Sequence, residues 1–141
     1  MSDEKVERFR ARVEERFRFL ESHGFRRSPA DERDSPVGSS VVYAGSHVGF
    51  RISYDVRDAQ VDLRIVRVRG GRLAEVGPGS YSSDLLQHLV EHAGYRGGWG
   101  ARGPAAAEAD PLEHMVDSWA ELLRAEGGPL LADGAEALPS R

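Results

Sequence analysis

Two histidines four residues apart are the side chains of this sequence whose type and spacing most directly suggest chemistry. Asp84, His88 and His92 follow one another at steps of four, which places them on one side of a helix. Two histidines at this spacing can share a metal ion, but a third ligand must come from another segment, because Asp84 and His92 lie about 12 Å apart along the helix axis. The order H-E-x-x-H is absent. The alternative is a solvated flank on which Asp84 pairs with His88.

A glycine-rich segment, residues 98–103, matches the dinucleotide fingerprint G-x-G-x-x-G in its letters. Its context excludes that function, because the fingerprint needs a strand before it and a helix opening inside it, whereas a predicted helix precedes it and Pro104 follows. The segment and its approach carry residue types that dominate binding hot spots, and we expect them to contact a partner: Tyr95, Arg96, Trp99 and Arg102. The alternative is that Trp99 folds back over the edge of the core.

Three acidic residues, Glu113, Asp117 and Glu121, lie at positions i, i+4 and i+8 of the last long predicted helix. Like charges at this spacing cost about 0.2–0.5 kcal/mol per pair. One explanation is an outward acidic face that meets a basic partner. The other is a solvated face whose repulsion Arg124 relieves.

Five arginines of the strand-rich middle of the chain lie on predicted strands or at one hairpin end. Arg51 and Arg64 fall on the polar side of adjacent predicted strands, and three more crowd one hairpin end: Arg67, Arg69 and Arg72. If helices cover only the apolar side, this polar face is open and can hold a phosphate or an acidic protein. The alternative is cross-strand pairing of Arg51 and Arg64 with Asp55 or Asp62.

No nucleophile motif is present. In Gly-Ser-His-Val-Gly, residues 45–49, the serine stands one place too early for G-x-S-x-G. We therefore assign no catalytic residue and expect no cofactor, although an active site assembled across the fold would leave no trace in the sequence.

The elements that must position these residues follow from hydrophobic periodicity. Apolar residues at steps of three and four predict a helix over residues 2–23, ended by Gly24 with Phe25 folding back. A polar segment with two prolines, residues 26–38, is typical of a mobile loop. Apolar residues then alternate along four segments, which predict a four-stranded antiparallel meander: 41–44, 48–54, 61–68 and 73–76. The alternation changes phase after Ile65, which indicates a bulge or cover on both faces.

Two more helices are predicted after the meander. Ser80 or Ser82 can cap a helix that ends at Gly94, and Asp110-Pro111 begins a helix that Gly127-Gly128 closes. The fold class is therefore α+β, with an N-terminal helix, the meander and two C-terminal helices packed on one sheet face. Residues 1–128 are predicted to form one domain, and residues 129–141 a loosely attached tail on which Leu130 and Leu131 could dock.

The composition of the chain limits the classes of function that the protein can have. The chain has 141 residues, no cysteine and a net charge of −4, and residues 73–141 alone carry −7. An acidic balance argues against general nucleic-acid binding, and the absence of cysteine excludes disulfides and thiolate zinc sites. No apolar run approaches the roughly 18 residues of a membrane span, and the first residues are charged where a signal peptide has an apolar centre. We expect a cytoplasmic protein.

Several segments share an order found elsewhere. Phe17-Arg18-Phe19-Leu20-Glu21 leads to Gly24-Phe25, then come Val42-Tyr43, residues 48–55 and the apolar strand 61–68. This order resembles a pattern in small uncharacterised bacterial proteins and in some immunity proteins of toxin–immunity pairs. The resemblance implies a cytoplasmic protein that binds another protein and performs no reaction, and it assigns no individual residue.

The sequence thus leads to one hypothesis, one alternative and a third interpretation, which is a homo-oligomer that pairs through the edge strand at residues 73–76 or through the first predicted strand. The hypothesis is a protein-binding module, of immunity type, that binds and neutralises a partner. Its contact surface is formed by seven residues: Tyr95, Arg96, Trp99, Arg102, Glu113, Asp117 and Glu121. The alternative is a small metal-dependent or phosphate-handling enzyme that uses His88, His92 and the sheet arginines. The oligomeric state stays open.

Overall fold

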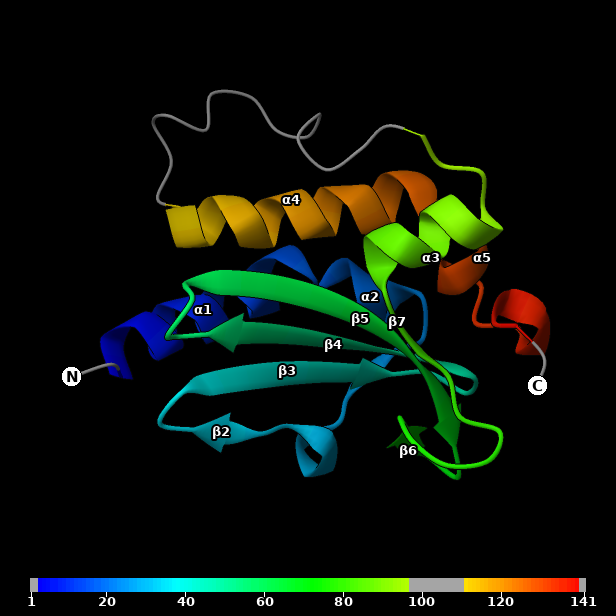
Figure 1. Ribbon diagram of the computed structural model, residues 1–141, viewed down its shortest axis with the longest axis horizontal. Coiled ribbons are helices and arrows are strands. Elements are labelled where there is room, and N and C mark those ends of the chain that lie inside the picture. Colours follow the sequence, from blue (N-terminus) through cyan, green and yellow to red (C-terminus); the bar gives the residue numbers. More distant parts are fainter. Residues whose placement is uncertain (1–2, 97–110, 140–141) are drawn as a thin grey trace.

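A computed structural model describes residues 3–96 and 111–139 of the chain (Figure 1). It begins with α1 (Asp3–Arg16) and the short α2 (Phe19–Ser22). The single helix expected over residues 2–23 is therefore broken, with Leu20 bonding back to Phe17 at the break. The predicted end is confirmed: Gly24 has φ 94°, and the N–H groups of Gly24 and Phe25 donate to Glu21 and Leu20, which is a Schellman cap.

The sheet is built around the predicted meander. In the described residues it has seven strands, not four, in the order β1-β3-β4-β5-β6, with β2 added beside β3 and β7 beside β5. All the pairings are antiparallel. The strands are β1 (Arg26–Arg27), β2 (Asp34–Ser35), β3 (Gly38–Ala44), β4 (Val48–Asp55), β5 (Gln60–Arg69), β6 (Arg72–Ala74) and β7 (Ser82–Asp84).

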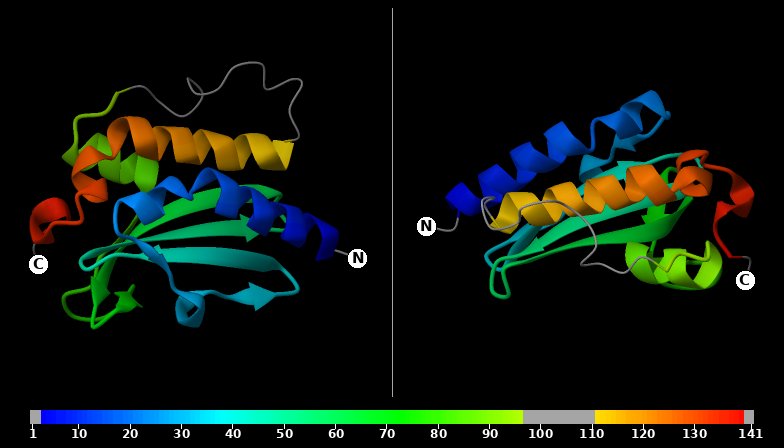
Figure 2. Two further views of the ribbon diagram at one scale, coloured as in Figure 1. Left: turned by 180° about the vertical axis from the view of Figure 1, so that it is seen from behind. Right: turned by 90° about the horizontal axis from the view of Figure 1, so that it is seen from above.

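The main hydrophobic core lies between one face of this sheet and the helices. Alternate residues of β3, β4 and β5 stand in register here, such as Tyr43 opposite Phe50 and Phe50 opposite Ile65. They pack against Phe9 and Val13 of α1 and against α4 (Pro111–Glu126), and all are buried. Figure 2 shows α1 and α4 side by side across this face. The α+β class is confirmed, with an N-terminal helix and C-terminal helices on a curled antiparallel sheet.

The phase change after Ile65 comes from cover on both faces. The register of β5 with β4 runs without a bulge from Gln60 to Arg67, and Val66 and Val68 are buried on the face opposite the main core. β6 covers the end of β5 that carries Val66 and Val68. A Cβ added to Gly49 of β4 would collide with the side chain of Leu73 in β6. Gly49 therefore makes room for the strand that buries Val66 and Val68.

Residues 26–38 are not the mobile loop that their prolines suggested. They form β1, a short 3-10 helix η1 (Pro29–Asp31) and β2, and they lie against the second sheet face. The physical reason is ionic. Glu32 accepts hydrogen bonds from Arg10, Arg27 and the backbone N–H of Val42, and Asp31 accepts from Arg72. A polar segment without hydrophobic periodicity is thus ordered by its charged side chains.

The C-terminal part continues past α4 into packed structure. It contains α5 (Gly128–Leu131) and the 3-10 helix η3 (Ala135–Ala137), and Leu130, Leu131 and Leu138 are buried in the main core. Residues 129–139 are therefore packed against the rest of the chain rather than loosely attached. The expected domain boundary at residue 128 stays a prediction. Among residues 3–96 and 111–139, no helix is long and apolar enough to cross a membrane.

Candidate functional site

A cleft of about 350 Å³ lies where α3 (Leu85–His92) meets the C-terminal segment, at one end of the molecule (Figure 1). We call it the α3 cleft. α3 is capped by Asp84, whose carboxylate accepts from the N–H of Gln87 at 3.2 Å, rather than by Ser80 or Ser82. The titratable residues that line the cleft are His88, His92, Glu126 and Glu136. The rest of the lining is apolar or small, and Leu89, Leu130 and Leu138 form its floor with buried side chains.

The two histidines lie together but in different environments. Their ring centroids are 5.0 Å apart. His88 is buried, and its Nδ1 forms a 2.7 Å hydrogen bond with the hydroxyl of Tyr81, whereas the side chain of His92 is 41% exposed. Burial, assisted by the neighbouring His92, lowers the pKa of His88 to about 4. His88 is therefore neutral at pH 7 and adds no positive charge to the cleft.

The order of residues on α3 is also that of an inverted zinc motif. His88, Glu91 and His92 fit H-x-x-E-H, which the sequence reading missed. Glu91, however, is exposed and accepts a hydrogen bond from Gln87 at 3.0 Å. Within the described part of the chain, no group of three or more histidine, aspartate or glutamate side chains is placed to hold a metal ion. His88 and His92 offer two ligands where a metal site needs a third.

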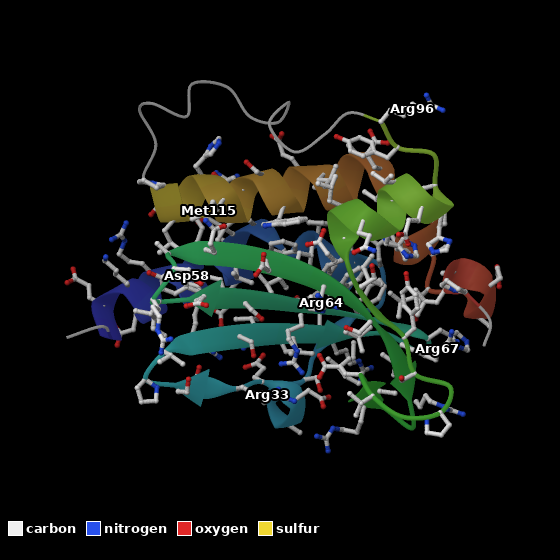
Figure 3. All side chains as sticks on the ribbon, in the orientation of Figure 1. Arg33, Asp58, Arg64, Arg67, Arg96 and Met115 are labelled. Atoms are coloured by element: carbon white, nitrogen blue, oxygen red, sulfur yellow. The ribbon has the colours of Figure 1, made fainter. Side chains whose placement is uncertain are left out.

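The C-terminal wall of the cleft is held in place by polar contacts. Asp133, in the left-handed conformation with φ 58°, accepts hydrogen bonds from the backbone N–H groups of Ser46, His47 and Val48 at 2.5–2.9 Å. The guanidinium of Arg67 donates to the carbonyl of Pro139. Figure 3 shows Arg67 at this end of the molecule. The wall that carries Glu136 is therefore fixed at both ends.

The predicted acidic face of α4 does not point outward as a unit. Arg12 of α1 donates two hydrogen bonds to Asp117, at 2.9 and 2.6 Å, and Arg16 adds an ion pair at 3.0 Å. Arg12 also lies 4.0 Å from Glu113. The hydrogen bonds to Asp117 raise the pKa of Arg12, so this cation stays charged. Glu121 is exposed. Two of the three acidic residues, Glu113 and Asp117, thus stabilise the contact between α1 and α4 instead of forming an outward acidic face.

The four residues predicted around the glycine-rich loop have separate outcomes. Tyr95 is buried in the main core, which contradicts the expectation that it is displayed to a partner. The aromatic ring closes the core where α3 ends. Arg96 is exposed, as Figure 3 shows. Trp99 and Arg102 lie outside the described residues.

The five sheet arginines do not form one anion site, which contradicts the expectation of an open arginine-rich face. Arg51 is 7% exposed, and its guanidinium donates to both carboxylate oxygens of Glu75 at 2.9 Å and to the carbonyl of Asp31. Arg64 stands opposite Arg51 in the register but is exposed and bonds to Ser82. The remaining three donate to separate partners: Arg67 to Pro139, Arg69 to Pro78 and Arg72 to Asp31.

Tyr81, Glu126 and Glu136 are the site residues that sequence reasoning missed. No sequence spacing joins them to His88, because they come from three separate segments that meet only in the folded chain. Glu126 ends α4, where an acidic side chain is unfavourable for the helix dipole, and this was the one signal available. Comparison of the chain with models of protein families, with curated proteins and with solved structures finds no match.

Proposed function

We propose that this protein is a binding module that recognises another protein by taking a basic side chain of that partner into the α3 cleft. The observation that carries the proposal is the charge of the cleft. In the part of the chain that the structure describes, Glu136 lines the cleft without an ion pair, Glu126 lies beside it, His88 is neutral at pH 7, and no arginine or lysine lines the cleft. A guanidinium or ammonium group is the complement of such a lining.

The shape of the cleft supports the same ligand. Leu89, Leu130 and Leu138 provide an apolar floor for the methylene stem of an arginine or lysine, while Glu136 meets its charged end. The cleft also lies at the carboxyl end of α4, where the helix dipole favours a cation. Arginine is among the residues that dominate protein–protein contacts.

The charge of the whole chain is consistent with a basic partner. Residues 73–141 carry a net charge of −7. In the described part of the chain, Asp117 and Glu75 are neutralised by arginines and Asp133 by backbone N–H groups. Glu136 and Glu121 form no ion pair there. The carboxylate of Glu136 in the cleft can therefore meet a basic partner, whereas that of Asp117 beside α1 is already paired. The resemblance to immunity proteins adds to the proposal that binding neutralises the partner.

A charge-reversal pair tests the proposal. Glu136→Lys places a cation in the cleft, and Glu7→Lys makes the same change of net charge on the exposed side of α1. In affinity capture from lysate of the native cells, read by mass spectrometry, Glu136→Lys should lose the partner that the wild type and Glu7→Lys retain. In a direct titration, N-acetyl-arginine amide should shift the His92 ring signals, and N-acetyl-leucine amide should not.

Two outcomes would overturn the proposal. One is undiminished capture of the partner by Glu136→Lys. The other is an identical response of His92 to the arginine and leucine amides. The same capture experiment with Trp99→Ala tests the sequence prediction for Trp99. If this variant loses the partner, the contact surface extends beyond the cleft. If capture is unchanged, Trp99 is not part of the contact surface.

One observation favours the alternative of a metal-dependent enzyme. The rings of His88 and His92 line the same cleft with centroids 5.0 Å apart, in the order of an inverted zinc motif. Metal analysis of protein purified without an affinity tag separates the two candidates. Stoichiometric zinc, manganese or iron that His92→Ala abolishes would favour the enzyme over the binding module.

A further inference from the structure

A second cavity, of about 250 Å³, lies near the other end of α4 and serves no part of the proposed function. Its walls come from α1, from the amino end of α4 and from the β4–β5 region. Figure 3 labels Met115 and Asp58 toward this end of the molecule, away from Arg67. The residues that line it are Lys5, Arg8, Tyr54, Ala59, Pro111, Leu112 and Met115. We call it the α1–α4 pocket.

The lining of this pocket divides into an apolar wall and a basic rim. Tyr54 and Leu112 are buried members of the main core, and Met115 packs against that core. The charged residues of the lining, Lys5 and Arg8, are both basic, and they lie on the same side of α1 because they are three residues apart. None of the described residues that line the pocket is a carboxylate. An apolar body with a negative group at one end is the ligand that complements both parts.

We propose that the α1–α4 pocket binds a small carboxylic acid with an apolar body, of the size of a medium-chain fatty acid. The apolar body lies against Tyr54, Leu112 and Met115. The carboxylate lies at the rim, beside the exposed ammonium of Lys5. The volume, below the usual range for drug-sized ligands, restricts the occupant to a short chain or a single ring.

Methionine is well suited to the wall of such a pocket. Its unbranched side chain adapts to ligands of different shape, which is why methionine is frequent at permissive binding surfaces. Met115 is also a convenient probe, because the chain has two methionines, Met1 and Met115. Selective ¹³C-methyl labelling gives one signal in the pocket and one at the amino terminus, and Met115→Leu assigns them.

The experiment is a titration of the labelled protein with sodium octanoate below its micellar concentration, followed by the Met115 methyl signal. Octanoate should shift this signal saturably and leave that of Met1 unchanged. Octylammonium, with the same chain and the opposite charge, should bind at least about tenfold more weakly, because the Lys5 ammonium repels it and attracts octanoate.

Neutralising variants test the recognition of the carboxylate. Lys5→Gln, on an exposed side chain, should weaken octanoate binding about two- to fivefold. Arg57→Gln is the matched control, because it removes an exposed cation of the β4–β5 turn that does not line the pocket, and it should leave the affinity unchanged.

Three results would overturn the inference. The absence of a saturable Met115 shift shows that the pocket takes no such acid. Equal affinities for octanoate and octylammonium show that the pocket is apolar and does not recognise the charge of its ligand. An equal loss of affinity in Lys5→Gln and Arg57→Gln shows general electrostatic attraction rather than a site. None of these outcomes bears on the α3 cleft, so failure here leaves the proposed function untouched.

Discussion

The two faces of the sheet are both covered, but by different chemistry. On one face, Phe50, Ile52 and Leu63 meet the apolar sides of α1 and α4. On the other, Arg51 meets Glu75 and the carbonyl of Asp31, and a polar segment rather than a helix forms the cover. Apolar contacts are non-directional and tolerate many neighbours, whereas each buried charge needs a particular partner at hydrogen-bond distance. A segment that covers a sheet face can therefore be well ordered without being amphipathic.

Removing a ring from the apolar face should have the largest effect on stability. Phe50 is fully buried and contacts Phe25 with ring centroids 5.1 Å apart. Phe50→Ala should lower the free energy of unfolding by about 3–5 kcal/mol, because it leaves a cavity that the sheet and helices cannot close. Urea denaturation measures this. Phe19→Ala, at a half-buried ring beside Arg124, is the control and should cost much less. Equal losses would contradict the assignment of Phe50 to the centre of the core.

Removing a charge from the polar face should have the next largest effect. Arg51→Ala leaves the carboxylate of Glu75, which is 23% exposed, without its two hydrogen bonds, and should cost about 2–3 kcal/mol. Arg64→Ala, directly opposite in the register but exposed, should change stability by less than about 0.5 kcal/mol.

A double variant sharpens the distinction between the faces. Replacing both members of the pair, as Arg51→Met with Glu75→Leu, should recover much of the loss, because no buried charge is then unpaired. If the double variant is less stable than Arg51→Ala, the hydrogen bonds from Arg51 to Asp31 and Ser40 matter more than the pair with Glu75.

At neutral pH the smallest effect is expected at His88, which acts on the pH dependence of stability. The pKa of His88 is lowered to about 4 from 6.5, so between these values the unfolded chain binds a proton that the folded chain does not. His88 should therefore make stability fall as the pH falls from 6.5 to 4, by up to about 1.4 kcal/mol per pH unit. His88→Gln should remove this slope, and exposed His47→Gln should keep it. A slope unchanged in His88→Gln would refute the assignment.

The polar face should respond in a lower pH range. Burial alone would raise the pKa values of Asp31 and Glu32, but hydrogen bonds from Ser28 and Arg72 to Asp31, and from Arg27, Arg10 and the Val42 N–H to Glu32, together lower them. These carboxylates stabilise the fold above their unfolded-state pKa values near 4, and that stability is lost as the pH falls further. Acid unfolding that persists below pH 4 in His88→Gln should therefore report the polar face.

The parts of the fold that periodicity encodes could be predicted, and the parts that depend on partners could not. The meander and the glycine end of the first helix follow from local patterns, as Gly24 and the alternation of residues 48–54 show. Residues 26–38 are held in a defined structure by arginines from α1, β4 and β6. These arginines lie too far away in the sequence for a local pattern to include them. The sequence pattern predicted a mobile loop there for this reason.

The candidate site was predicted only in part, for a similar reason. The spacing of His88 and His92 was visible, but the burial that chiefly lowers the pKa of His88 arises only where α3 meets the C-terminal segment in the folded chain. The acidic stripe of α4 was visible as well, yet its partners Arg12 and Arg16 are about a hundred residues away in the chain. A charge pattern shows which groups need a partner and leaves open where the partner comes from.

The carboxylate of Asp133 has a consequence for the order of folding. It closes the turn between β3 and β4 from a position 85 residues beyond Val48. A contact of such long sequence separation carries a large loop-closure entropy and forms after the local hairpin. During synthesis, the hairpin is therefore complete in outline while three of its turn amides are still solvated. The Asp133 contact, which forms late in folding, thus completes the β3–β4 hairpin, which is synthesised early.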